Sequence, residues 1–375
     1  MKKLVTTALA LAAAGSASNA GTGDNEWLAL DGEIKNLASS LTPPRDGMGW
    51  AVLLRTAFTY SRDDILTFGG DDIDGFSFRD VDFAVWGSQG DYGWRLNTDV
   101  ENNFGNEDIV LEDAYAWWHC GEYFTASMGS MKPRFIRTGF IDPEKTLFID
   151  RSAIGSAFDY WDLGIQARGN YDALAWFLGV FNGDDSDETD HAYFLRGEWD
   201  LGAGAGMAEG ALGGNDDVNA TVGVAYYTDD SLDSGNSDTN AWALDVAGSA
   251  GPLGFGGEYV KLGDDANFFE TNGPFGGSNS DDFLSGTFLD FDGDSSPWDL
   301  WASWLLSPEW ELGVRYESLD NDQFSNDNTL LSVVAAWYQG GHNAKWQAQY
   351  TSVDASSGNP DGSVFQVGLS LGMTH

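Results

Sequence analysis

The sequence has few basic residues, a single cysteine and no long apolar run beyond its N-terminus. Its 375 residues include 18 Lys plus Arg against 59 Asp plus Glu, and the resulting net charge of -41 excludes a nucleic-acid partner held by bulk charge. Cys120 alone cannot form an internal disulfide. After residue 20 no apolar run approaches the roughly 18 to 20 residues of a membrane helix. The four histidines lack a nucleophile motif, so we expect neither enzyme activity nor a cofactor.

The first 20 residues have the parts of a secretory signal peptide. Lys2 and Lys3 precede a short apolar stretch, and the small residues that end at Ala20 predict cleavage after Ala20. A helical pattern over 24–41 follows, within a segment over 21–48. Its apolar residues recur every three or four positions: Trp27, Leu30, Ile34, Leu37 and Leu41. Two interpretations stay open: an amphipathic helix lying on its own domain, or a short coiled coil that joins copies of the chain.

From residue 49 to the C-terminus the apolar residues alternate with small, polar or charged ones, the period of β-strands. Aromatic residues make up 14% of the chain and glycines number 48, as expected for strands joined by tight turns. We predict sixteen strands, over 49–61, 76–87, 91–103, 108–119, 122–130, 160–170, 172–182, 190–201, 218–229, 239–250, 252–262, 297–306, 309–319, 329–338, 344–354 and 363–372.

Strand length and link length decide between two all-β architectures. Alternation fits a soluble sandwich with an apolar core, or a membrane barrel with an apolar face toward lipid. Strands of about 10 to 12 residues favour the barrel. Short links such as 88–90 alternate with long ones such as 131–159 and 263–296, and a further strand-like stretch over 281–292 falls inside the second. The sequence therefore predicts a 16-stranded antiparallel transmembrane β-barrel over 49–375.

Several motifs between residues 75 and 185 resemble the phosphate-selective porin O/P family of Gram-negative outer membranes. They are "FRDVDFAVWG", "LEDAYAWW", "MGSMKPRF", "LFIDRS" and "GVFNGDD", in the order of the family. The resemblance implies a 16-stranded porin, a homotrimer, with loops folded into a water-filled channel for small ions and solutes, anions such as phosphate among them. Two features depart from the family pattern. Asp80 and Asp82 stand in its basic strand, and the chain ends in "GLSLGMTH" rather than in an aromatic residue.

The long link that begins at Met131 concentrates positive charge. Over 131–151 it holds five basic residues and the acids Asp142, Glu144 and Asp150. We expect this link to fold inward and narrow the pore, where its cations would attract anions. These predicted constriction residues are Lys132, Arg134, Arg137, Lys145 and Arg151. The alternative is that the acids of the link and its surroundings neutralise them.

A second set of charged residues falls on the polar face of the predicted strands. We expect these to line the lumen: Arg55, Asp82, Arg95, Asp99, Asp113, Arg168, Arg196 and Arg315. Partial pairing between these arginines and lumen acids is the alternative to free charges. An acidic stretch over 290–296 resembles part of a calcium loop but lacks the distal Glu, so we predict solvated acid and no metal.

The sequence thus favours an exported protein of the bacterial outer membrane, with membrane lipid and small solutes as its partners. Two other classes remain as alternatives. A secreted soluble β-sandwich that binds a ligand would share the alternating pattern and be extracted without detergent. A barrel without conductance, serving adhesion, would share the strands as well.

Overall fold

The structure is a computed structural model, which describes residues 46–61, 73–103, 106–121, 124–183, 191–229, 239–263, 294–320, 328–354 and 361–374. The expected signal peptide, the helical pattern over 24–41 and the strand-like stretch over 281–292 lie outside these residues. None of the helices within them is long and apolar enough to cross a membrane.

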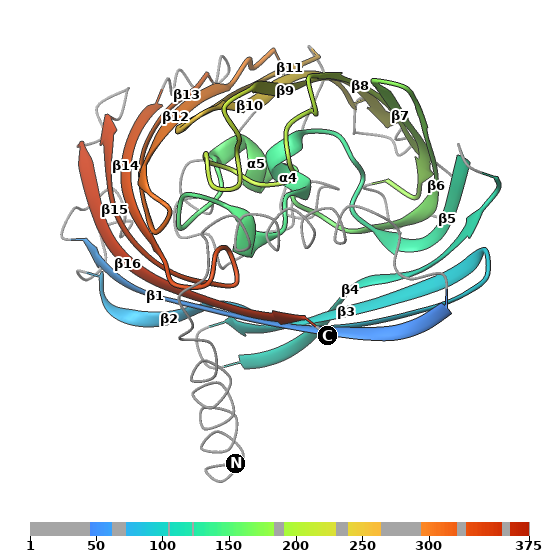
Figure 1. Cartoon of the computed structure of the whole chain (residues 1–375), viewed down its shortest axis with the longest axis horizontal. Helices are drawn as coiled ribbons and strands as arrows, with labels where there is room; N and C mark the ends of the chain where they lie inside the picture. Colours follow the sequence, from blue (N-terminus) through green and yellow to red (C-terminus); the bar gives the residue numbers. More distant parts are fainter. Residues whose placement is uncertain are drawn as a thin grey trace, which may run out of the picture. The chain divides into compact units, whose positions relative to one another are not determined.

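Sixteen strands form one closed barrel, which confirms the predicted fold class and strand count (Figure 1). The strands are β1 (Asp46–Ser61), β2 (Ile73–Gln89), β3 (Tyr92–Asn103), β4 (Asn106–His119), β5 (Phe124–Met131), β6 (Asp162–Tyr171), β7 (Leu174–Phe181), β8 (Ala192–Leu201), β9 (Val218–Asp229), β10 (Thr239–Ala250), β11 (Leu253–Leu262), β12 (Trp298–Ser307), β13 (Trp310–Leu319), β14 (Asn328–Tyr338), β15 (Ala344–Asp354) and β16 (Gly362–Thr374). Each pairs antiparallel with its neighbours in sequence, and β1 closes the ring on β16. Closure leaves no sheet edge unpaired.

The burial pattern of β13 shows which face of the sheet points outward. Leu312, Val314 and Tyr316 are at least 40% exposed, whereas Glu311 and Arg315 on the other face are almost fully buried. The apolar face is therefore the outer face, and the polar face lines the interior. This arrangement is the reverse of a soluble sandwich and is that of a barrel in lipid.

The links at the two ends of the barrel differ in length. At one end β2–β3, β6–β7, β10–β11 and β12–β13 are joined by two residues each, and β1 begins and β16 ends at this same end. One link there is an exception, because residues 202–217 join β8 to β9. The opposite end carries longer links, among them the one between β5 and β6, except that two residues join β3 to β4.

The β5–β6 link lies inside the barrel, as the sequence predicts (Figure 1). It contains three short helices: α4 (Arg137–Phe140), the 3-10 helix η1 (Pro143–Lys145) and α5 (Ala153–Ala157). We call residues 132–161 the inward segment. Its buried side chains pack against inward-facing side chains of the wall in two apolar clusters.

Candidate pore constriction

Apolar side chains hold the inward segment against the wall. Phe135 and Ile136 are buried in one cluster with residues of β7 to β11. Leu147 and Phe148 are buried in a second cluster with Trp301 and side chains of β14. Two separate apolar anchors in one irregular segment explain why it packs inward rather than extending into water.

Long polar side chains of the wall supply hydrogen-bond partners for the backbone of the segment. Buried N–H and C=O groups outside regular structure need such partners. Gln347 Nε2 donates to Leu147 O at 2.7 Å, and Gln349 Oε1 accepts from Ile149 N at 2.8 Å. Lys345 Nζ donates to Thr146 O. Three alternate residues of β15 therefore bind the backbone of the segment between Thr146 and Ile149.

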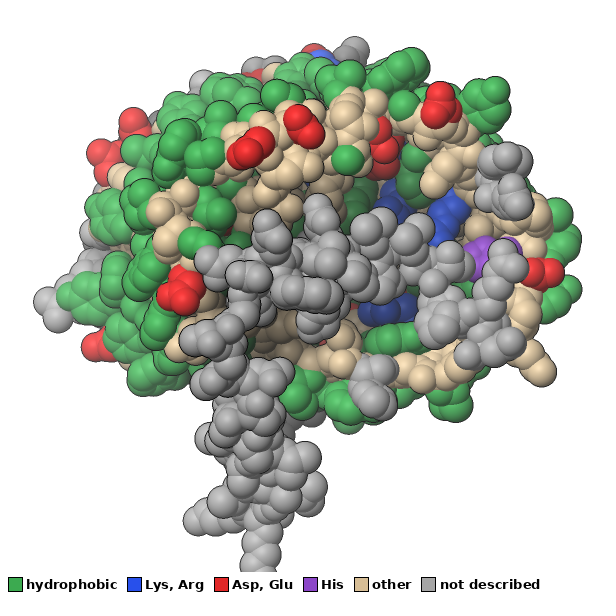
Figure 2. Space-filling view, in the orientation of Figure 1, with side chains coloured by type: hydrophobic (Ala, Val, Ile, Leu, Met, Phe, Trp, Pro, Cys, Tyr) green, Lys and Arg blue, Asp and Glu red, His purple; other side chains and the backbone are tan. Residues whose placement is uncertain are grey.

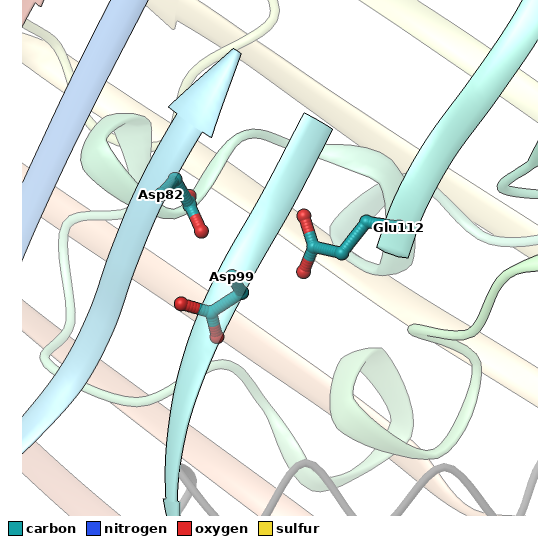
Figure 3. A group of neighbouring side chains, drawn as sticks. All are labelled: Asp82, Asp99 and Glu112. Atoms are coloured by element: carbon teal, nitrogen blue, oxygen red, sulfur yellow. The ribbon is translucent and has the colours of Figure 1, made fainter. Parts of the chain in front are cut away.

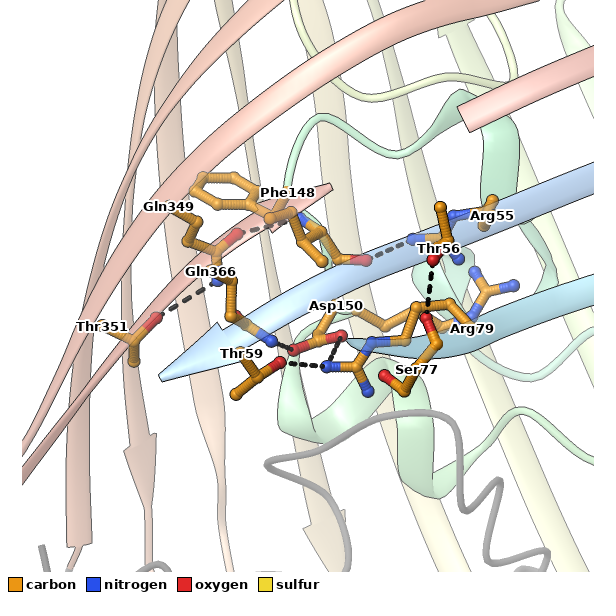
Figure 4. Close-up of polar contacts among 12 residues, drawn as sticks. Arg55, Thr56, Thr59, Ser77, Arg79, Phe148, Asp150, Gln349, Thr351 and Gln366 are labelled. Carbon is orange, nitrogen blue, oxygen red and sulfur yellow. Dashed lines mark hydrogen bonds and ion pairs between the residues drawn. The ribbon is translucent and has the colours of Figure 1, made fainter. Parts of the chain in front are cut away.

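The side chain of Asp150, at the end of this stretch, is contacted from two strands, β2 and β16 (Figure 4). Its carboxylate accepts from Gln366 Nε2 at 2.8 Å and lies 3.7 Å from Arg79 Nη2. Arg79 also donates to Thr59 Oγ1 at 3.4 Å. Asp150, one of the three acids of the predicted constriction, is thus bound to side chains of the wall.

Two arginines of the wall bind the segment in the same way. Arg196 on β8 and Arg315 on β13 each pair with a glutamate two residues later, at 2.8 Å. Arg196 Nη1 donates to Phe135 O, and Arg315 donates to the carbonyls of Asp150 and Arg151. Both are buried. They face the lumen as expected, but the segment covers them.

The predicted constriction residues Arg137 and Arg151 are also buried. Arg137 Nη2 donates to Gly206 O in the β8–β9 link. Arg151 pairs with Asp159 at 2.7 Å and donates to the carbonyls of Thr138 and Ile141. Both guanidinium groups are therefore buried by these contacts and are out of reach of a passing solute.

Lys132 and Lys145 are partly exposed and are paired with acids. Lys132 lies over the ring of Trp161 at 4.0 Å and forms an ion pair with Asp159. Lys145 Nζ lies 2.6 Å from Asp142 Oδ2. Burial would raise the pKa of Asp142, but the ammonium of Lys145 outweighs it and holds that pKa below its usual range.

Arg134 differs from these four. Its guanidinium lies 4.9 Å from the ring of Phe140 and 5.0 Å from the ring of Phe177. Burial and repulsion by Arg168 lower the pKa of Arg134 to about 10, so it remains charged at neutral pH. Phe177 is the cross-strand partner of Arg168, so Arg134 of the inward segment and Arg168 of the wall lie at one patch of the interior.

Other predicted lumen residues lie on β1 to β4. Arg55 is buried, pairs with Asp80 at 2.6 Å and donates to Ile149 O. Arg95 is partly exposed and pairs with Asp113 at 2.6 Å. Both arginines are thus paired with acids rather than free.

Three carboxylates gather beside this wall: Asp82, Asp99 and Glu112 (Figure 3). Their oxygens lie within 4.8 Å of one another, and such oxygens are the donors that hard divalent cations prefer. A β-bulge brings Glu112 into the group, because two residues of β4 stand opposite the single Asn97 of β3. Asn97 donates to Glu112. The result is a negative patch on the same wall as Arg95.

The fold and this interior agree with the comparisons to known proteins. The family model described as phosphate-selective porin O and P matches residues 60–277. The chain belongs to this family. No curated protein matches the sequence. The porin family and the barrel make this protein a channel of the outer membrane, through which small ions and solutes diffuse passively.

Solved structures of other porins share the fold at low identity. An anion-selective porin from Comamonas acidovorans is 12% identical, with a TM-score of 0.59, and the match covers 88% of this chain and 100% of that one. A loop-deleted OmpT of Vibrio cholerae is 11% identical, with the same TM-score and coverage. The outer-membrane protein opdK of Pseudomonas aeruginosa is 12% identical, with a TM-score of 0.53, over 88% of this chain and 99% of that one.

Sequence reasoning missed two contributors to the interior of this porin. Strand alternation assigns only Asp113 to the lumen, and the bulge places Glu112 there as well. The β8–β9 link is the second contributor: its sixteen residues separate two predicted strands at an end where other turns are short. Its length was the available signal.

Proposed function

We propose that this porin favours anions at its constriction and that Arg134 and Arg168 provide the attraction. Among the residues that the structure describes, these are the two partly exposed arginines with neither an ion pair nor a hydrogen bond to another side chain or backbone group. Every other described arginine forms an ion pair with an acid or donates a hydrogen bond to a backbone carbonyl. This observation carries the proposal.

The expected attraction is large enough to matter in a chain of net charge -41. At about 6 Å from a guanidinium, with an effective dielectric constant of about 40, a univalent anion gains about 1.4 kcal/mol per arginine. That is roughly a tenfold rise in local occupancy. Charges farther than about 10 Å through saline are largely screened, so the remote acids of the surface do not cancel it.

Phosphate is a candidate solute because a guanidinium can bind two of its oxygens at once. The space-filling view supports an exposed positive surface within the mouth, since Lys and Arg side chains are visible inside the hollow and acids stand mainly on its rim (Figure 2). The carboxylates of Asp82, Asp99 and Glu112, on β2, β3 and β4, add a negative patch to the same interior. Positive and negative patches in one lumen create a field across the path of the solute.

The test is the reversal potential of purified protein in a planar bilayer under a potassium chloride gradient. We expect Arg134→Gln and Arg168→Gln each to move it toward cation selectivity, and the double variant to move it furthest. Lys261→Gln is the matched control, because Lys261 carries the same charge but pairs with Asp294 at the end of β11. An unchanged reversal potential in the double variant would refute the role of both arginines. Block of the current by phosphate, lost in the double variant, would extend the selectivity to that solute.

We also infer that the protein is a homotrimer, as membership of the family suggests. Static light scattering of detergent-solubilised, unheated protein measures the mass of the assembly. A mass of one chain after correction for detergent would refute it.

A further inference from the structure

The β8–β9 link, residues 202–217, enters the barrel from the end opposite to the inward segment. Asn219 and Thr221 of β9 accept from Ala203 N and Ala205 N, each at 2.8 Å, which turns the start of the link toward the interior. Farther along, Glu311 Oε1 accepts from Ala211 N at 2.5 Å. The link is therefore fixed to the wall on both sides of its tip.

The tip of the link binds the inward segment directly. Glu209 N donates to Lys145 O at 3.0 Å, and Glu209 Oε2 accepts from Leu147 N at 2.8 Å. Glu209 is only 1% exposed. Ala205 and Leu212 of the link pack against the apolar cluster that contains Leu147. Two hydrogen bonds from one residue bracket Thr146, immediately after the helix η1.

The stretch that Glu209 supports is the most exposed and most charged part of the segment. Asp142 is 53% exposed at its side chain, and Glu144 and Lys145 are partly exposed. Wall side chains bind the segment before and after this turn, through Arg196 and Gln349 for example. The turn itself is bound by the link and by Lys345, and its helix η1 also contacts β16.

We propose that the β8–β9 link is a second element of the constriction and that Glu209 is the residue that positions the charged turn at η1 in the pore. This inference deepens the proposed function and rests on the same constriction. Pore width is then set from both ends of the barrel. Loss of the bond between Glu209 and Leu147 frees the turn to leave its place, and a second, larger conductance level appears.

Gly254 on β11 offers an independent way to move the link. A Cβ at this position would lie 2.5 Å from Gly210 C and 2.7 Å from Ala211 N, which are backbone atoms. Real Cβ atoms do not approach so closely, so Gly254→Ala displaces the tip while Glu209 stays intact. Gly197→Ala is the matched control, since a Cβ there meets nothing within 4 Å.

Single-channel recordings of the full-length protein in planar bilayers test the proposal. For Glu209→Ala we expect the occupancy of a larger level to rise about tenfold, the equivalent of the ~1.4 kcal/mol that one hydrogen bond to a charged group contributes. Glu209→Gln should behave as the native protein, because its amide oxygen can accept from Leu147 N. Asp216→Asn, an exposed acid of the same link, is the charge-matched control.

Several outcomes would overturn the proposal. One is a single unchanged level in Glu209→Ala, and another is an effect of Glu209→Gln as large as that of Glu209→Ala, which would make charge rather than the bond responsible. If Glu209→Ala does not fold, Gly254→Ala decides, and native conductance in that variant refutes a role for the link. Reversal potentials of the Arg134 and Arg168 variants are measured separately, so a failure here leaves the anion proposal standing.

Discussion

Removal of the Asp245 carboxylate is expected to destabilise the barrel and to loosen the segment next to Arg134. Asp245 on β10 binds Arg196 on β8 through two parallel hydrogen bonds, of 2.6 and 2.8 Å. The pair spans β9 at Gly223, where a Cβ would lie 2.2 Å from Arg196 Nη2. Arg196 in turn holds Phe135 O. The pair therefore links three strands to the residue that follows Arg134.

The magnitude follows from burial. Both side chains of the pair have an exposed fraction of 0%, so solvent screening does not weaken their interaction. Breaking a buried pair by removing one partner costs about 3–5 kcal/mol, because the remaining charge stays buried. Replacing both partners with apolar side chains removes that charge. The double change Arg196→Met with Asp245→Leu should then recover all but the ~1–3 kcal/mol of the donor lost to Phe135 O, since Glu198, the other partner of Arg196, is partly exposed and can be hydrated instead.

Urea unfolding in detergent micelles, followed by tryptophan emission, measures these free energies, and the four proteins of the cycle give the coupling. Asp216→Asn serves as the exposed control and should change the free energy of unfolding by less than about 0.5 kcal/mol. A cost below about 1 kcal/mol for Asp245→Leu contradicts the assignment of a buried pair. So does a double variant no more stable than Asp245→Leu alone.

Two further predictions concern pH and the outer face. Burial and the neighbouring Asp142 raise the pKa of Glu144, so this carboxylate is neutralised at a higher pH than an ordinary glutamate. Anion selectivity should therefore increase as the pH is lowered from neutral, which reversal potentials measured across that range would show. In Glu144→Gln this pH response should disappear; its persistence would assign the response to another group. Leu244→Arg, on the outer face of β10, should lower the free energy of unfolding by about 2–4 kcal/mol in a bilayer, and a neutral effect in a lipid-vesicle unfolding assay would place Leu244 away from lipid.

The strands could be predicted closely because each carries its own signal. β9, β10 and β15 begin and end at the predicted residues, since strict alternation runs up to the turn at each end. Alternation assigns neighbouring residues to opposite faces, however, and a bulge breaks that rule. This is why alternation places Asp113 in the lumen, correctly, but leaves out Glu112.

The inward segment could be predicted in place but not in detail. Its length and its cluster of basic residues indicated an inward fold. Its anchors are far away in sequence: Gln347 binds Leu147 O, and Arg315 binds Asp150 O. No local pattern connects residues so distant. The sequence therefore could not tell which of the five basic residues would be buried by those contacts.

Net charge is a poor guide to the selectivity of such a pore, because the arginines of the interior have two different roles. Some anchor the inward segment, and others face the path of the solute. Arg55, Arg196 and Arg315 donate to carbonyls of the inward segment and hold it in place. Arg134 lies between aromatic rings without an acid beside it, on the same patch as Arg168. The anchoring arginines also fix the position of Arg134, because Arg196 binds the carbonyl of Phe135, the residue that follows Arg134. An acidic chain can thus favour anions when a few guanidinium groups are kept apart from its acids, and losing an anchoring arginine should alter selectivity without removing a charge from the pore.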